Sequence, residues 1–258
     1  MILLSFDIEE FDTPMEHGIN LPIEEQMRIS IEGTKKILNV LKQQEVKATF
    51  FCTANYALRA PELIKEMLAN GHEVASHGYY HSTFEVADLL SSRNALEELT
   101  GRPITGYRMA RMMPVDEKAI ADAGYTYNSS LNPTCIPGRY CHLNKPRRWF
   151  YKEGVLQLPV SVTPWLRFPL FWLSCHHLPT FIYHLLALRT YRYDGYLITY
   201  FHPWEFVELG KMKELNLPYV ITHHSGQDMV GRLNDFIAYF KSKGVPFATF
   251  PMFIKTIR

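Results

Sequence analysis

The chain has 258 residues, of which 47% are hydrophobic, and this length and composition suit one large globular domain with a sizeable core. Lys and Arg number 27 against 26 Asp and Glu, so the net charge is +1. This balance argues against nucleic acid as a main partner, because neutralising phosphates requires clustered basic charge.

The first residues, MILLSFDIEEFD, begin with an apolar run that is too short for a signal peptide and passes directly into acidic residues. We therefore expect a first strand rather than a leader, and a cytoplasmic protein. The four cysteines do not look like a disulfide framework. Cys135 and Cys141, beside His142, lack the CxxC spacing of a zinc site, so we expect free thiols.

Strand-like and helix-like segments alternate along the chain. Short β-rich apolar runs predict strands, whereas apolar residues at helical spacing, with proline near the start and glycine past the end, predict helices. The predicted strands are residues 2–11, 47–53, 72–77, 104–110, 155–162 and 195–201, and the predicted helices are residues 22–45, 60–71, 88–101, 114–124 and 230–244, with residues 247–253 following. Such alternation is typical of βαβ units, and a count near seven strands favours a distorted (β/α)7–8 barrel as a single domain, residues 1–258.

Residues 168–188, FPLFWLSCHHLPTFIYHLLAL, come nearest to a membrane span. Crossing a bilayer needs about 20 predominantly apolar residues, and this stretch is interrupted by Pro179 and three histidines, so we reject a spanning helix. Two interpretations are left: a barrel helix with a core face, which we favour, and peripheral membrane contact through residues 164–190.

The stretch GHEVASHGYYHS places His77 and His81 four residues apart, at the end of a predicted strand and in the turn after it. Imidazoles at this spacing commonly bind a divalent metal, provided that the segment coils so that both rings face one space. The alternative is a hydrogen-bonded histidine pair in a half-buried loop.

The first predicted strand ends in carboxylates. Side chains alternate between the faces of a strand, so Asp7 and Glu9 share one face and Ile8 takes the other. Two such carboxylates are costly to bury without a cation or hydrogen-bond partners. Chemistry in parallel barrels sits at the carboxyl ends of the strands, where these acids would supply an anionic ligand. The alternative is a solvated acidic loop start, since Glu10 and Asp12 follow.

Two further residues close predicted strands. His202 shares a face with Ile198 and Tyr200, and it is either a proton donor or an ordinary satisfied polar group. Arg108 ends another strand, and an arginine beside a carboxylate lowers the pKa of that carboxylate and fixes its direction.

Taken in order, the acidic first-strand motif, the block TFF…GHEVASHGYYH, the arginine motif and the late strand ending in histidine resemble the polysaccharide deacetylase family, carbohydrate esterase family four. The resemblance covers most of the chain, and the TFF…GHEVASHGYYH block is its specific part. It implies a metal-dependent hydrolase that removes an N-acyl group, acetyl or formyl, from an amino sugar. The sequence further resembles the branch that acts on lipid-linked amino sugars in cell-envelope biosynthesis, at the cytoplasmic face of the membrane.

The resemblance also implies roles for individual residues. It implies that Asp7 is the catalytic base, tethered by Arg108, and that His202 is the general acid. It implies that His77 and His81 bind the divalent metal, with Zn²⁺ as the first choice. The usual second aspartate falls on Ile8, which cannot ligate, so Glu9 is expected as the third metal ligand.

Other positions depart from the family pattern. Arg111 is added to the arginine motif, Tyr200 stands where a leucine lines the acetyl pocket, and Asn128 stands where an aspartate often supports the general acid. The changes at Ile8, Tyr200 and Asn128 support one alternative, a non-catalytic sugar-binding barrel. A second alternative is an allantoinase-like amide hydrolase, because that chemistry occurs on the same fold. Three aromatic residues are candidates for stacking on sugar faces: Tyr79, Trp165 and Trp204.

Overall fold

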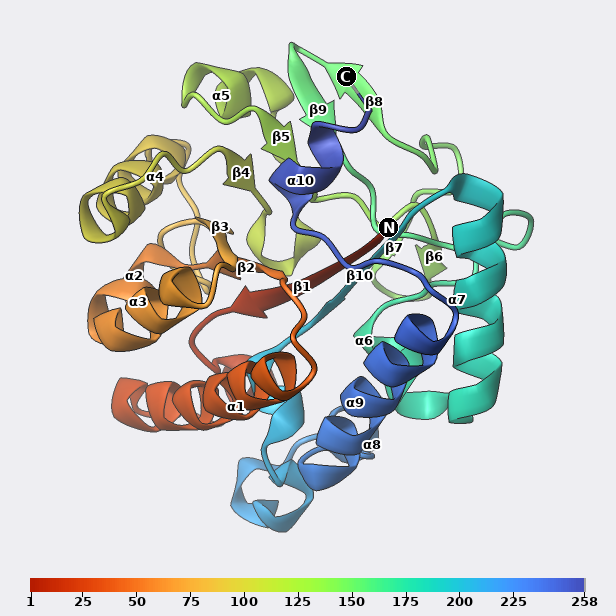
Figure 1. Cartoon of the computed structure of the whole chain (residues 1–258). Coiled ribbons are helices and arrows are strands. Elements are labelled where there is room, and N and C mark those ends of the chain that lie inside the picture. The colour runs from red at the N-terminus through yellow and green to blue at the C-terminus, as the bar shows by residue number, and fades with distance from the viewer. Residues whose placement is uncertain (258) are drawn as a thin grey trace.

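The structure, a computed structural model, describes residues 1–257 as a curved sheet surrounded by helices (Figure 1). Eight strands form one sheet in the order β10-β1-β2-β3-β4-β5-β9-β8, in which all neighbours are parallel except β8 and β9. These strands are β1 (Ile2–Ile8), β2 (Thr49–Cys52), β3 (Glu73–Ser76), β4 (Gly106–Tyr107), β5 (Tyr127–Asn128), β8 (Phe150–Lys152), β9 (Val155–Gln157) and β10 (Leu197–Phe201). The predicted distorted (β/α)7–8 barrel in a single domain is confirmed.

Most of the helices cover the outer side of the sheet, but the last one lies over the barrel interior and packs in the same cluster as Leu3 (Figure 1). The helices are α1 (Ile23–Gln43), α2 (Ala54–Arg59), α3 (Pro61–Ala69), α4 (Ala87–Thr100), α5 (Glu117–Asp122), α6 (Trp172–His177), α7 (Thr180–Asp194), α8 (Tyr219–Thr222), α9 (Gln227–Ser242) and α10 (Phe250–Ile254). The five predicted helices all form. The predicted strand 104–110 is reduced to β4, and its last residue, Ala110, instead begins a 3₁₀ turn in which Arg111 has a φ of 56°.

Side-chain alternation along β1 separates the core from the barrel interior. Ile2, Leu4, Phe6 and Ile8 lie in the large apolar cluster that contains buried residues of the covering helices, whereas Leu3 lies in a second cluster. Asp7 is on the face of Leu3 and lines a cleft, so the predicted separation of Asp7 from Ile8 is found.

The barrel approaches closure where the chain after β9 runs beside β10. The backbone N–H of Ser161 donates to the carbonyl of Ile198 at 3.0 Å, and the N–H of Ile198 donates to Oγ of Ser161 at 2.8 Å. The predicted strand 155–162 is therefore one extended segment whose first part pairs with β5 and whose second part reaches β10.

Residues 168–188 divide into α6 and the start of α7 at Pro179, and α7 buries Tyr183, Ala187 and Leu188. The favoured barrel helix with a core face is therefore found. None of the helices among residues 1–257 combines the length and apolar character that a membrane crossing requires.

The expectation of free thiols is wrong for two of the four cysteines. The strands β6 (Cys135–Ile136) and β7 (Tyr140–Cys141) form an antiparallel hairpin in which Cys135 and Cys141 are directly opposite and joined by a disulfide. The hairpin turn brings these residues together at a separation of six, so the pairing does not require a CxxC motif. Cys52 and Cys175 are free and buried.

Gly33 explains how α1 packs against the turn that follows β10. A Cβ atom at this position would lie 1.8 Å from the carbonyl oxygen of Pro203, which begins the 3₁₀ helix η3 (Pro203–Phe206) directly after His202. The glycine that weakens the predicted helix therefore permits close contact between α1 and the backbone beside His202.

We predict that Gly33→Ala lowers the free energy of unfolding by about 1–3 kcal/mol, because the added methyl group overpacks against backbone. Gly231→Ala in α9 is the matched control, because nothing lies within 4 Å of its Cβ position. That change should raise the free energy of unfolding by about 0.5–1 kcal/mol through helix propensity. Urea unfolding measures both values, and a stabilised Gly33→Ala protein would contradict the packing described.

Candidate active site

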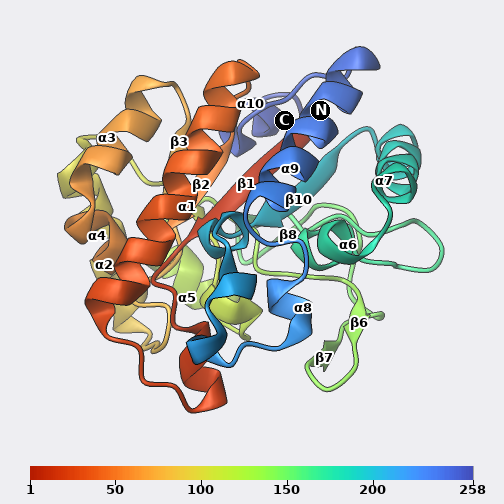
Figure 2. The same cartoon turned by 90° about the horizontal axis from the view of Figure 1, so that it is seen from below.

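A cleft of ≈ 430 Å³ opens where β1, β3 and β10 end, and it gathers residues from distant parts of the chain. Its lining includes Tyr140 of β7 and Ile221 of α8. Figure 2 shows β7 and α8 at one end of the molecule, away from the N-terminus. Five of the six predicted site residues line this cleft: Asp7, Glu9, His77, His81 and His202. The sixth, Arg108, lies beneath it.

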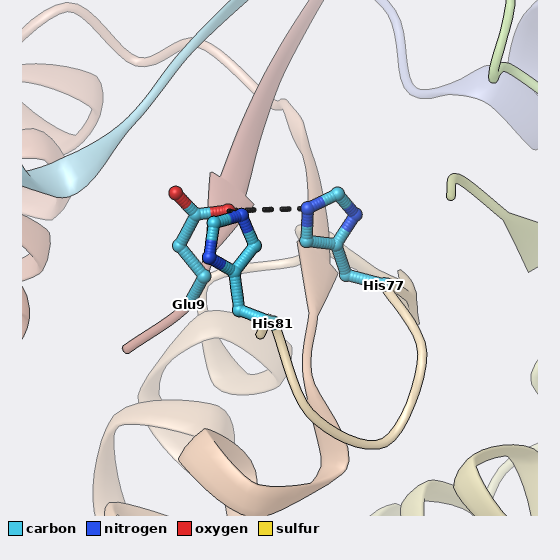
Figure 3. A group of neighbouring side chains, drawn as sticks. All are labelled: Glu9, His77 and His81. Atoms are coloured by element: carbon cyan, nitrogen blue, oxygen red, sulfur yellow. Dashed lines mark hydrogen bonds and ion pairs between the residues drawn. The ribbon is translucent and has the colours of Figure 1, made fainter. Parts of the chain in front are cut away.

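Glu9, His77 and His81 form a compact buried group (Figure 3). One ligand atom from each lies within 4.8 Å of the others. Oε2 of Glu9 is 3.2 Å from Nε2 of His77 and 3.0 Å from Nε2 of His81. The histidines reach this position through a loop with Gly78 at a φ of 88°, and not through a helical turn.

The other ring nitrogens of both histidines are occupied. Nδ1 of His77 is 2.9 Å from the carbonyl oxygen of Arg108, which can only accept, so this nitrogen carries the proton. Nδ1 of His81 is 2.7 Å from Oδ1 of Asp12. Acceptors on Nδ1 leave Nε2 of both rings directed at Glu9, which is the orientation that metal-binding histidines commonly have.

The charges of this group depend on one another. Burial alone would raise the pKa of Glu9, but the charge of His81, the hydrogen bond from His77 and the charge of His202 lower it to about 2. Burial alone would lower the pKa of His81, but Glu9 and Asp12 raise it to about 9. The carboxylates of Glu9 and Asp12 thus favour a positive charge between Glu9 and the two imidazoles. A proton on His81 or a bound metal cation can supply that charge.

The donor set fits a divalent metal. Two imidazole nitrogens and one carboxylate oxygen are a ligand combination found in catalytic zinc sites, where three protein ligands leave a coordination position open. The side chains of all three residues are almost fully buried, so their donor atoms are held in place by packing. This geometry agrees with the predicted ligands, whose role as metal ligands stays a prediction.

Asp7 is held by a fully buried arginine. Nη1 of Arg108 donates to Oδ1 of Asp7 at 2.6 Å and to Oγ of Ser5 at 3.1 Å, and the remaining guanidinium nitrogens donate to Ser129. The guanidinium carbon also lies 4.0 Å from the centre of the Phe51 ring. The predicted tether between Arg108 and Asp7 is therefore present as a contact, and the carboxylate has a fixed direction.

His202 is bound by a carboxylate that the sequence analysis did not identify. Nδ1 of His202 is 2.9 Å from Oε1 of Glu205, a fully buried residue three positions later. Oε2 of Glu205 is 3.0 Å from Nε2 of His176, whose Nδ1 donates to the carbonyl oxygen of His223 at 2.7 Å. Burial alone would lower the pKa of His202, but the hydrogen bond to Glu205 and the charge of Glu9 raise it.

The structure shows the contacts of three residues that depart from the family pattern, Asn128, Tyr200 and Arg111. Asn128 donates to Gln157 at 2.8 Å and accepts from Ser130, so Glu205 and not Asn128 is the partner of His202. The hydroxyl group of Tyr200 lies 3.3 Å from Nδ2 of Asn132. Arg111 lines the cleft and donates to Asp12 at 2.8 Å. Of the three aromatic candidates for sugar stacking, only Trp204 is among the residues lining the cleft.

The acidic loop after β1 is buried, so its interpretation as solvated is wrong. Glu10 accepts hydrogen bonds from Thr53 and Asn55, and Asp12 lies between His81 and Arg111. Asp12 is a second residue of the candidate site that the sequence analysis missed. The sequence did offer a signal for Asp12: it follows shortly after Asp7 and Glu9, the two carboxylates at the end of the first predicted strand.

The fold and the site together describe a (β/α) barrel with a candidate metal centre at the carboxyl ends of its strands. Residues 25–127 match the family model described as polysaccharide deacetylase. A chitin deacetylase from Colletotrichum lindemuthianum is 40% identical over 77 residues, which cover 27% of this chain and 31% of that protein. A structure assigned as a polysaccharide deacetylase from Mycobacterium smegmatis has a TM-score of 0.71 at 20% identity, covering 100% of this chain and 89% of that chain. Residues 25–127 thus match the polysaccharide deacetylase family in sequence, and the whole chain has a fold found in that family, so the predicted resemblance is confirmed.

The matched segments span 22–37% of the length of the first three curated relatives. Three of the six candidate residues lie inside the matched range 25–127, namely His77, His81 and Arg108, and the other three lie outside it. A CE4 family pseudoenzyme from Bacillus anthracis shares the fold with a TM-score of 0.54 at 13% identity, covering 98% of this chain and 64% of that chain. The fold alone therefore does not separate catalysts from non-catalytic relatives.

Proposed function

We propose that the protein is a metal-dependent hydrolase that removes an acetyl or formyl group from an N-acylated amino sugar. The substrate is a glycan or a lipid-linked sugar precursor of cell-envelope polysaccharide, and residues 1–258 form the catalytic domain. One observation carries this proposal: a Glu–His–His group, an arginine-bound aspartate and a carboxylate-bound histidine meet around one cleft. Metal-assisted amide hydrolysis uses a Lewis acid, a base and an acid, and this arrangement offers ligands for the first and residues for the other two.

Glu9, His77 and His81 would hold the divalent metal, with Zn²⁺ as the first choice because of its preference for imidazole and carboxylate ligands. When bound, such an ion polarises a carbonyl group and makes a water molecule beside it more acidic. The chain contributes the orientation of the donor atoms, since Asp12 and the carbonyl of Arg108 fix the two imidazole rings.

Asp7 is the base in this proposal. Arg108 holds one oxygen of its carboxylate at 2.6 Å, so the other oxygen is free to take a proton from the attacking water. His202 is the acid and protonates the nitrogen of the leaving amine, because an unprotonated amine is a poor leaving group. Glu205 favours the protonated form of His202 that this step requires.

A panel of N-acetyl and N-formyl hexosamines, free and carrier-linked, tests the proposal through release of a primary amine or of the acid. Amine release by the metal-loaded protein supports it. Sugar binding without hydrolysis would favour the non-catalytic barrel. Hydrolysis of a cyclic ureide, with no activity on any N-acyl sugar, would favour the allantoinase-like alternative.

We predict that His77→Ala loses the metal, because one of three ligands is removed, while Asp7→Asn retains the metal and loses turnover by at least about 10²-fold, the lower range for a general base. Elemental analysis of dialysed protein and the amine-release assay measure the two effects. Tyr80→Phe, at an exposed position in the same loop, is the control and should keep both properties. Full metal occupancy in the His77→Ala protein would refute the ligand assignment.

We predict that Glu205→Gln moves the alkaline limb of the kcat profile to lower pH. The carboxylate raises the pKa of His202, and a general acid is lost as pH rises through its pKa, so a lower pKa ends activity earlier. The maximal kcat should fall as the ring loses its orientation. Asn128→Asp in the same protein should not restore the profile, because Asn128 contacts Gln157 and Ser130. An unchanged profile for Glu205→Gln would show that Glu205 does not act through His202.

The cytoplasmic localisation stays a prediction. The disulfide between Cys135 and Cys141 is a bond that persists mainly in oxidising compartments, which argues in the other direction. Cell fractionation together with thiol alkylation of the freshly lysed cells distinguishes the two, because a reduced pair in the cytoplasmic fraction would agree with the prediction.

A further inference from the structure

The helix α7 is apolar on its solvent-exposed side as well as on its buried side. Tyr183, Ala187 and Leu188 face the core, whereas Phe181 is 72% exposed and Leu185 is also exposed. A surface helix usually confines its apolar residues to the core-facing side. The outer side of α7 is therefore a candidate contact surface.

The loop between β9 and α6 extends this apolar side. Trp165 and Leu166 are 75% and 87% exposed, and the Trp165 ring centre lies 6.1 Å from that of Tyr193, near the end of α7. The exposed α7 residues follow at helical spacings of three or four: Phe181, Leu185, Arg189, Arg192 and Tyr193. We call these seven residues the α7 surface.

The α7 surface lies in a segment of the sequence that is rich in positive charge. Residues 133–194 contain eight Lys and Arg but only two Asp and Glu, although the whole chain has a net charge of +1. One of the two acids, Asp194, is engaged by Arg147 at 2.6 Å. Arg189 and Arg192 stand on the exposed side of α7 beside its apolar residues. Arg139 and Lys152 of this segment pair with Glu16 and Glu117, so Arg189 and Arg192 are the positive charges that stand beside the exposed apolar side chains of α7.

We propose that the α7 surface docks on the headgroup region of an anionic lipid bilayer. Tryptophan, phenylalanine and leucine side chains enter the boundary between headgroups and acyl chains, while arginines on the same side reach the phosphates. The charge also argues against a second copy of the chain as the occupant, since two positive surfaces facing each other repel. This surface gives the predicted contact through residues 164–190 specific residues and a lipid chemistry, and it does not depend on catalysis.

The test is co-sedimentation of the full chain with vesicles of phosphatidylcholine alone and of equal parts phosphatidylcholine and phosphatidylglycerol. The protein should sediment with the anionic vesicles and be released by salt. Arg189→Glu with Arg192→Glu should lower the partition coefficient by about tenfold or more. Phe181→Ser with Leu185→Ser should lower it similarly, because less apolar surface is buried.

Matched controls exist elsewhere on the surface. Val86→Ser with Leu90→Ser removes two exposed apolar side chains near the start of α4, and Arg59→Glu with Arg102→Glu reverses two exposed charges; both should leave binding unchanged. A protein that stays in the supernatant with anionic vesicles overturns the proposal, as does equal loss of binding in the controls. A dimer in sedimentation velocity that only the α7 variants dissociate, without vesicle binding, assigns the surface to a second copy instead.

Discussion

The arrangement of the site depends on how the structure matches the negative charge that it buries. Asp7, Glu9 and Asp12 follow one another along the end of β1, and all three are almost fully buried. A buried carboxylate without a partner is destabilising by several kcal/mol. Each of the three has a cationic or hydrogen-bonding partner from another part of the chain: a guanidinium for Asp7, two imidazoles for Glu9, and an imidazole with a guanidinium for Asp12. The packing of the barrel therefore decides whether the site is stable, because the partners come from segments that only the fold brings together.

The register of the two central strands places the proposed base and acid at the same height. β1 and β10 are parallel neighbours, with Phe6 opposite Phe201, so Asp7 and His202 leave the sheet side by side at its carboxyl edge. Outside the sheet, α1 fixes the backbone that follows His202 through the close approach at Gly33. The proposed acid His202 and the residue that α1 packs against, Pro203, are thus neighbours in the chain.

The sequence predicts those parts of the site that depend on local periodicity. The two-residue repeat of a strand assigns Asp7 and Glu9 to one face, and the position of His202 at a strand end places it at the barrel mouth. Contacts of Glu205 were not predictable in the same way, because its second partner, His176, is 29 residues away and joins it only through the packing of α6. The strand β5 is only two residues long and shows little periodicity, so its place in the sheet depends on its neighbours. The hairpin that pairs Cys135 with Cys141 likewise has no apolar alternation by which to recognise it.

The surroundings of Asn128 and Tyr200 change how far these departures from the family pattern argue against catalysis. Considered one by one, Asn128 removes a carboxylate and Tyr200 replaces an aliphatic side chain, and both changes favour a barrel that binds without catalysis. The carboxylate is nevertheless present, because Glu205 occupies the position beside Nδ1 of His202. The Tyr200 ring centre lies 5.1 Å from the guanidinium carbon of Arg108, so it shields the cation that orients Asp7. Glu205 also accepts a hydrogen bond from the backbone N–H of His202 and lies 3.0 Å from Nε2 of His176, so its burial is satisfied by partners on three sides. Because Glu205 supplies the carboxylate beside His202, the missing aspartate at Asn128 is no longer an argument against the proposed acid.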